Sequence, residues 1–96
     1  MKKIIVQYKV KIGRAEENSD LIRAVFKELN SANPSGFQYT SSLLADGVTF
    51  VHQATLQDEN PLNNMASFKN FTKDLKDRCE EPPVALEATQ IGSFGI

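Results

Sequence analysis

The 96-residue chain has one cysteine, one histidine and no tryptophan, and its net charge is only −1. A single cysteine, Cys79, cannot form an internal disulfide or a cysteine-based metal cluster. No apolar run approaches the roughly 20 residues that a membrane-spanning helix needs. A nearly neutral chain also lacks the overall positive field that holds a nucleic acid. Together with a length typical of one domain, these absences predict a single domain over residues 1–96 that binds neither membrane nor nucleic acid.

The N-terminal residues are typical of a strand and not of a secretory signal. Gln7, Lys9 and Lys11 interrupt the apolar stretch that a signal peptide would require. We therefore expect a cytoplasmic protein. Over residues 4–12 the apolar residues recur at every second position, which predicts a strand with one buried face. That face carries Ile4, Val6, Tyr8, Val10 and Ile12.

The apolar period then changes along the chain. Residues 15–32 place Leu21, Ile22, Val25, Phe26 and Leu29 on a single helical stripe. Strands are predicted over residues 37–44 and 48–56, and Asp46-Gly47 between them is typical of a two-residue hairpin turn. A second helix is predicted over residues 64–80, capped by Asn64 and ended by Pro82 and Pro83. Residues 84–91 form the last predicted strand.

This order of elements, β-α-β-β-α-β, defines the fold class. It predicts an α+β, ferredoxin-like domain whose four-stranded antiparallel sheet carries two helices on one face. The other face offers short polar and β-branched side chains with few charges outside the first strand. Such a surface suits a moderately polar interface between two sheets. We therefore expect a homodimer in which two sheets pack face to face as a dimeric α/β barrel.

The chain resembles the antibiotic biosynthesis monooxygenase-like family of dimeric α/β barrels. The resemblance is carried by the opening strand, glycine turn and acidic helix start of residues 4–17, by the strand Gly47 to Ala54, and by Pro61 followed by Phe68-x-x-Phe71. It implies a homodimer with a small pocket between helices and sheet. Some members of the family oxygenate polycyclic aromatic compounds without metal or cofactor, others open haem rings, and many have no assigned activity.

The chain departs from the family pattern at two points. Haem-degrading members use an asparagine, a tryptophan and a histidine on a helix, whereas this chain has no tryptophan and its histidine belongs to a predicted strand. This difference disfavours haem oxygenation. The members that oxidise polycyclic compounds also rely on tryptophan, so the resemblance leaves the substrate open.

His52, Tyr8 and Tyr39 are the candidate catalytic residues. All three fall on apolar columns of predicted neighbouring strands, so they converge if the strands pair as expected. An imidazole and two phenol hydroxyls in an apolar pocket suit acid–base chemistry on an aromatic ligand. Alternatively, each of the three is a core residue without a catalytic role. His52 would then be satisfied by one hydrogen bond, and the tyrosine rings would pack in the core.

Four further residues on the predicted helix stripes are candidates for lining a ligand pocket, although core packing accounts for them equally well. They are Phe26, Met65, Phe68 and Phe71.

Two functional hypotheses follow. The first is a cofactor-independent, monooxygenase-like protein that acts on or binds a small hydrophobic or aromatic molecule and needs no metal. The second is a non-catalytic homodimer that binds a small ligand or has a structural role. RNA recognition motifs share the element order, but here Phe50 lies on the buried column, which disfavours RNA binding.

Overall fold

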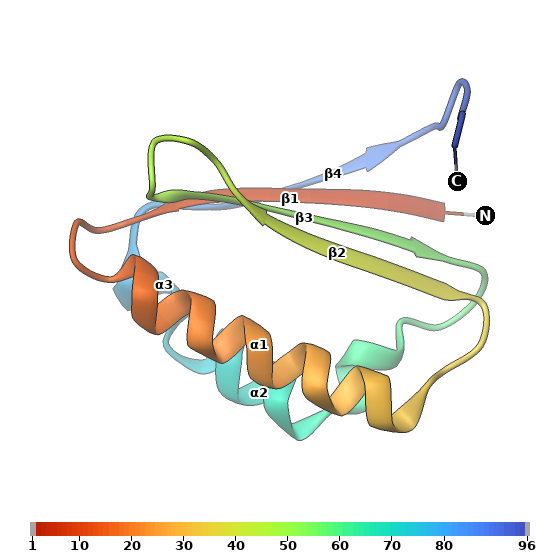
Figure 1. Ribbon diagram of the computed structural model, residues 1–96, viewed down its shortest axis with the longest axis horizontal. Coiled ribbons are helices and arrows are strands. Elements are labelled where there is room, and N and C mark those ends of the chain that lie inside the picture. Colours follow the sequence, from red (N-terminus) through yellow and green to blue (C-terminus); the bar gives the residue numbers. More distant parts are fainter. Residues whose placement is uncertain (1, 96) are drawn as a thin grey trace.

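The computed structural model describes residues 2–95 and contains four strands and three α-helices within them. Helices α1, α2 and α3 lie together on one side of the sheet, and the other side carries no helix (Figure 1). The elements are β1 (Lys2–Val10), α1 (Ala15–Ala32), β2 (Phe37–Leu43), β3 (Thr49–Leu56), the 3₁₀ helix η1 (Pro61–Asn64), α2 (Ala66–Lys73), α3 (Leu75–Arg78) and β4 (Cys79–Ala88).

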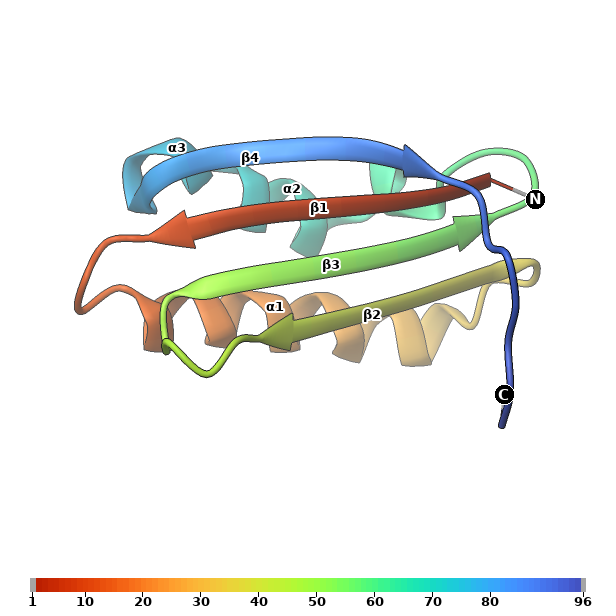
Figure 2. The same cartoon turned by 90° about the horizontal axis from the view of Figure 1, so that it is seen from above.

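The strands form one antiparallel sheet in the order β2-β3-β1-β4 (Figure 2). The first and last strands of the chain are therefore neighbours, because the crossover through α2 and α3 passes over β1 and adds β4 on its far side from β3. The predicted ferredoxin-like fold class is confirmed. Strands β1 and β3 are central, so side chains on their helix-facing side are covered from every direction.

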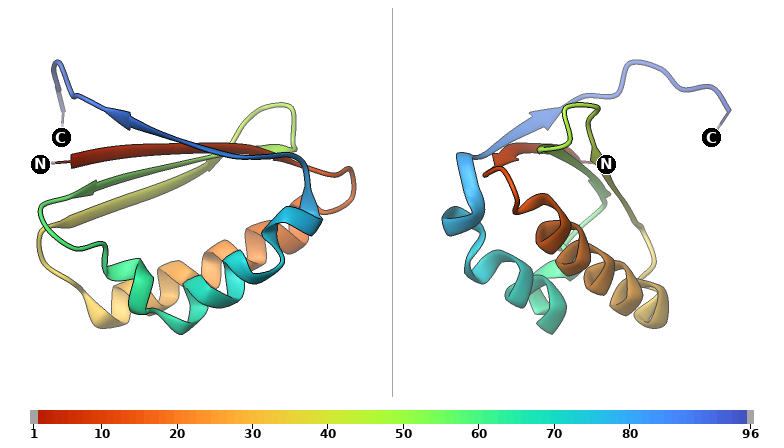
Figure 3. Two further views of the ribbon diagram at one scale, coloured as in Figure 1. Left: turned by 180° about the vertical axis from the view of Figure 1, so that it is seen from behind. Right: turned by 60° about the vertical axis from the view of Figure 1, so that its left-hand side comes forward.

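Two further views show the helices covering one face of the sheet (Figure 3). The core lies between these two layers. Tyr8 and Val10 of β1 and Phe50 of β3 meet the stripe of α1 there. The second helical layer closes the core with Leu62, Met65, Phe71 and Leu75.

The prediction for the second helix was wrong in its bounds. Helix α2 ends at Lys73, α3 is a single further turn, and Cys79 already begins β4. Pro82 and Pro83 thus lie inside a strand and end no helix. They are tolerated because β4 pairs only with β1 and is an edge strand, where a missing N–H costs little. The register between β1 and β4 also shifts near these prolines, between Gln7 and Lys9.

The predicted cap of this helix was also wrong. Met65, not Asn64, precedes α2, and it makes no side-chain cap hydrogen bond. The capping side chain is that of Asn60. Its Oδ1 accepts a hydrogen bond from the N–H of Leu62 at 3.0 Å at the start of η1. A 3₁₀ turn therefore occupies the residues expected to start the helix.

Two strand ends differ from the prediction. Strand β1 ends at Val10, and Ile12 is 95 % exposed because the chain turns away at Gly13 with a φ of +88°. The connection of β2 to β3 is a longer loop, Leu44 to Val48, in place of a two-residue turn. Asp46 closes this loop, since its carboxylate accepts hydrogen bonds from the Thr49 hydroxyl and from the N–H groups of Val48 and Thr49. These hydrogen bonds, that of the hydroxyl above all, hold the pKa of Asp46 below its usual range.

None of the helices within residues 2–95 has the length and apolar character needed to cross a membrane. In the same part of the chain, no three His, Cys, Asp or Glu side chains are grouped in a way that would hold a metal ion.

Leu62 provides a test of this core. Leu62 is 2 % exposed, whereas Leu43 at the end of β2 is 46 % exposed. Leu62→Ala should lower the free energy of unfolding by about 2–5 kcal/mol, because it removes buried methyl groups and leaves a cavity. Leu43→Ala should change it by less than about 1 kcal/mol. Urea denaturation followed by circular dichroism measures both, and equal effects would contradict the placement of η1 in the core.

Candidate functional site

His52 lies at the centre of the helix-covered face of the sheet. It belongs to β3, which is flanked by β1 and β2, and it is paired with Val6 on one side and Ser41 on the other. The residue two positions along each neighbouring strand is a tyrosine, Tyr8 on β1 and Tyr39 on β2. The alternation of strand side chains therefore brings both phenol rings to the same face as the imidazole.

The imidazole forms hydrogen bonds through both ring nitrogens. The Tyr8 hydroxyl lies 2.8 Å from Nε2. Nδ1 lies 2.6 Å from the Ser41 Oγ and 3.1 Å from the Tyr39 hydroxyl. The three rings are also stacked, with centroids 5.3 Å apart for Tyr8 and His52 and 5.9 Å apart for Tyr39 and His52. The structure thus brings the three candidate catalytic residues into one cluster.

Two polar residues that the sequence analysis did not single out complete this cluster. The Asn18 Nδ2 group donates to the Tyr8 hydroxyl at 2.9 Å, and the Arg78 Nε group donates to Asn18 Oδ1 at 3.1 Å. Asn18 is 0 % exposed and Arg78 is 1 % exposed. A signal was present: Asn18 lies four and seven residues before Ile22 and Val25, so it is a polar residue on the apolar stripe of α1.

Arg78 is a buried cation whose partners are neutral. No carboxylate within residues 2–95 forms an ion pair with it. Its Nη2 group instead donates to the Phe71 carbonyl oxygen at 2.6 Å, and its guanidinium lies 5.5 Å from the centre of the Phe71 ring. These hydrogen bonds and the cation–π contact compensate for the loss of hydration of the buried guanidinium.

A cavity of about 220 Å³ adjoins the His52 cluster, between the sheet and α2. Tyr8, Tyr39 and His52 line it, and so do Phe68 and Phe71. Phe26 and Met65, the other two candidate lining residues, lie elsewhere. Phe26 stacks on Tyr39 from α1 with ring centroids 5.3 Å apart, and Met65 is buried in the core. The remaining lining is mostly aliphatic and includes Ile4, Val6, Leu62 and Leu75.

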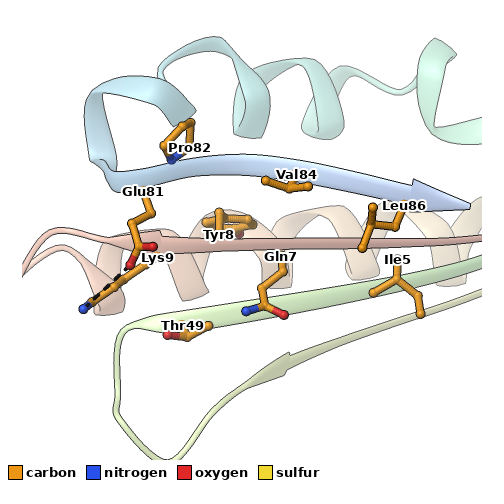
Figure 4. A pocket seen from close by; sticks show the side chains of 9 residues that line it. All are labelled: Ile5, Gln7, Tyr8, Lys9, Thr49, Glu81, Pro82, Val84 and Leu86. Atoms are coloured by element: carbon orange, nitrogen blue, oxygen red, sulfur yellow. Dashed lines mark ion pairs between the residues drawn. The ribbon is translucent and has the colours of Figure 1, made fainter.

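A larger hollow of about 480 Å³ lies on the opposite, helix-free face of the sheet (Figure 4). Side chains of β1 and β4 border it, among them Gln7, Val84 and Leu86, and Lys9 and Glu81 form an ion pair of 3.9 Å at its end. These side chains are mostly exposed and form no hydrogen-bonded cluster. The smaller cavity is the better candidate site, because it alone combines enclosing rings with convergent polar groups.

Burial sets the charge states of the cluster. It lowers the pKa of His52 to about 4, so the imidazole is neutral at pH 7. It raises the pKa of Tyr39 to about 12 and the pKa of Tyr8 still further, with the Asn18 hydrogen bond acting in the opposite direction on Tyr8. Burial likewise raises the pKa of the Cys79 thiol, which makes it a poor nucleophile.

The fold is similar to that of solved antibiotic biosynthesis monooxygenases. The crystal structure of one such enzyme superposes with a TM-score of 0.77 at 14 % identity, covering 96 % of this chain and 100 % of the other. A variant of SnoaB, a cofactor-independent oxygenase from Streptomyces nogalater, superposes with a TM-score of 0.70 at 14 % identity, covering 99 % and 97 %.

A protein of unknown function from Nitrosomonas europaea has the same fold, with a TM-score of 0.75, 15 % identity and coverage of 97 % and 91 %. No protein-family model and no curated protein sequence matches the chain. The resemblance that the sequence suggested is therefore confirmed at the level of the fold over nearly the whole chain. At such low identity the fold does not carry the activity with it.

The lowered pKa of His52 predicts a pH dependence of stability. The unfolded imidazole titrates near 6.5 and the folded one near 4, so the unfolded state binds the proton first as the pH falls. The stability contributed by neutral His52 is thus complete above pH 6.5 and is lost between pH 6.5 and pH 4. The loss is about 3 kcal/mol, since each pKa unit is worth about 1.4 kcal/mol.

Denaturation of the natural chain and of His52→Gln at pH 7 and pH 4 measures this loss. The natural chain should lose about 3 kcal/mol more than the variant, because the carboxyl groups that titrate in this range are common to both proteins and cancel in the difference. Equal losses in the two proteins would contradict a buried, neutral imidazole.

Proposed function

We propose that the cavity beside His52 binds a small hydrophobic or aromatic molecule, and that the protein is a monooxygenase-like enzyme that needs no cofactor. The observation that carries this proposal is the His52 cluster itself: one imidazole hydrogen-bonded to two phenols at the wall of an apolar cavity. The fold shared with a cofactor-independent oxygenase supports it. His52, Tyr8 and Tyr39 are the proposed catalytic residues, and Phe68 and Phe71 are the proposed ligand-contacting ones.

The cavity limits the ligand to a compact molecule. An apolar cavity of about 150 Å³ in another protein holds benzene, and this one has a volume of about 220 Å³. It therefore accommodates a single ring with small substituents. Phe68 and Phe71 offer ring surfaces, whereas the hydroxyl groups and the imidazole gather at the sheet, so a ring with one polar edge fits best.

The chemistry follows from the neutral imidazole. Oxygenation without a cofactor requires that the substrate be deprotonated, so that its electrons pass directly to dioxygen. Neutral His52 accepts such a proton, and Tyr8 lies in position to pass it on. When a ring carbon of hydroquinone is oxygenated to give a hydroxyquinone, one atom of dioxygen enters the product, and the other leaves as water with the two hydrogens that hydroquinone loses.

A non-catalytic ligand-binding protein is the second candidate. The charge states of the cluster favour it, because a base with a pKa of about 4 and phenols with raised pKa values are poor partners for proton transfer near pH 7. In this case the same hydroxyl groups would orient a bound ring without reacting with it.

Binding and dioxygen uptake separate the two candidates. Phenol and hydroquinone should bind in calorimetric titrations, and an enzyme should consume dioxygen with hydroquinone in an oxygen electrode. His52→Ala should reduce uptake by about 10²–10⁴-fold, the usual contribution of an acid–base group. Gln53→Ala is the matched control, because Gln53 is the next residue of β3 and is exposed on the other face.

Binding without uptake would favour the second candidate. Unchanged binding and uptake in His52→Ala would contradict the site.

We further propose that the protein is a homodimer formed through the helix-free face of the sheet, and that it is cytoplasmic. Exposed Val84 and Leu86 of β4 lie on this face, Leu86 beside Ile5. The segment 89–95 projects on the same side of the sheet and exposes Ile91 and Phe94 almost completely (Figure 1). A second copy would cover these apolar side chains, which a monomer leaves in water.

Leu86→Lys tests the dimer. Light scattering at micromolar concentration should give twice the chain mass of 10.7 kDa for the natural protein and a single chain mass for Leu86→Lys, because a charge is then buried in the interface. Ala85→Lys introduces the same charge at the adjacent exposed residue of β4, which points to the other side, and it should remain dimeric. A natural protein that is monomeric at this concentration would refute the proposal.

A further inference from the structure

A continuous chain of hydrogen bonds runs through the protein from Arg78 to Ser41. Its links join Arg78 to Asn18, Asn18 to Tyr8, Tyr8 to His52, and His52 to Ser41. Four of its five members are buried, and Ser41 at its end is half-buried. We call these five residues the polar chain. Its members come from α3, α1, β1, β3 and β2, so it crosses the whole core.

Arg78 determines the direction of every link. A guanidinium has only donors and keeps its proton at any ordinary pH. The atom of Asn18 that faces Arg78 must therefore be the carbonyl oxygen, which places the amide NH₂ of Asn18 against the Tyr8 oxygen. This assignment follows from hydrogen-bond chemistry alone, although the two ends of an amide look alike in most structures.

The orientation of the Tyr8 hydroxyl then determines which nitrogen of His52 carries the proton. Because the Tyr8 oxygen accepts from Asn18, the Tyr8 hydroxyl proton is free to point toward His52, whose Nε2 lies 2.8 Å away. Nε2 must accept this proton, so a neutral imidazole carries its own proton on Nδ1. Nδ1 in turn faces two hydroxyl oxygens, and Ser41 is the nearer at 2.6 Å. Burial without a facing carboxylate keeps the ring neutral at pH 7.

We propose that Arg78 and Asn18 are positioning residues that hold His52 as the Nδ1–H tautomer, with its basic Nε2 turned toward Tyr8, and that Ser41 is the outlet of the resulting one-way proton relay. All donors of the polar chain point from Arg78 toward Ser41. This role explains why a cation is buried without a carboxylate: an acid in place of Asn18 would satisfy Arg78 but would reverse the Tyr8 hydroxyl.

The relay supplies a path for the proton that the proposed reaction removes from its substrate, and its role in catalysis rests on that proposed function. The Tyr8 O–H bond breaks as Nε2–H forms, the Nδ1–H bond breaks as a new Ser41 O–H forms, and the original Ser41 proton passes to water. A proton from a bound ligand bonds to the Tyr8 oxygen in the same movement, so the net result is one proton moved from the ligand to solvent, and Tyr8 is a neutral phenol before and after. The imidazole ends as the Nε2–H tautomer and returns to Nδ1–H before the next transfer. Ser41 suits this role because it borders a hollow of about 430 Å³ between α1 and β2, on the far side of His52 from Tyr8.

The tautomer can be measured directly because the chain contains a single histidine. Long-range ¹H–¹⁵N correlation of the ligand-free protein at pH 7 should show Nε2 in the unprotonated range of nitrogen shifts and Nδ1 in the protonated range. The opposite pattern would overturn the proposal. The experiment uses no ligand, so its failure and a failure of ligand binding are distinguishable.

Asn18→Asp tests the control exerted by the polar chain. A carboxylate accepts from both Arg78 and Tyr8, so the Tyr8 hydroxyl should reverse, its oxygen should accept from His52, and the imidazole should shift to the Nε2–H tautomer. Asn30→Asp makes the same change at an exposed residue of α1 and should leave the Nδ1–H pattern unchanged. An Nδ1–H pattern that persists in folded Asn18→Asp would overturn the proposal, and the natural chain alone decides it if that variant does not fold.

Ser41→Ala tests the outlet. The tautomer should stay Nδ1–H, because Tyr8 still donates to Nε2, but the Nδ1 proton loses its nearer acceptor and its resonance should shift. Thr40→Ala, the preceding residue of β2 and exposed on the other face, should leave that resonance in place. An unshifted Nδ1 resonance in Ser41→Ala would show that Tyr39 is the acceptor and would overturn the assignment of Ser41.

Discussion

A guanidinium buried in the core, which can only donate hydrogen bonds, sets the direction of the hydrogen bonds that lead to the cavity wall. Arg78 reaches Asn18, and through it Tyr8 and His52, so four residues from four different elements must be satisfied together. A buried polar chain of this kind tolerates no missing member, because each unpaired group would cost the full price of its desolvation. The arrangement of α1 and α3 against the sheet is therefore tied to the orientation of the imidazole.

Hydrophobic periodicity was sufficient to predict the order of elements and the face of the sheet that the helices cover. It placed Tyr8, Tyr39 and His52 on one face because side chains of a strand alternate, and pairing through β3 then brought them together. It did not predict the end of the second helix. Pro82 and Pro83 indicated a helix stop, but their tolerance in an edge strand depends on which strands are neighbours, and that is a property of the tertiary structure.

The candidate site could be predicted only in part, for a similar reason. Aromatic side chains on apolar columns are easily recognised in a sequence, whereas Asn18 and Arg78 are ordinary surface residue types. Only the position of Asn18 on the apolar stripe of α1 indicated its burial, and the burial of Arg78 appears only when α1, α3 and β1 meet. Phe26 and Met65 show the converse. Their helical spacing indicated the core, but whether a core residue borders a cavity depends on small differences in packing that spacing does not encode.

We propose that a ligand binds in the small cavity bounded by the polar chain, and not in the larger hollow on the helix-free face of the sheet. A crystal structure of the protein soaked with phenol tests this most directly. We expect a phenol ring between the sheet and the side chains of Phe68 and Phe71, with its hydroxyl within hydrogen-bond distance of Tyr8, Tyr39 or His52. A ring bound only beside Val84 and Leu86, with the smaller cavity empty, would contradict it.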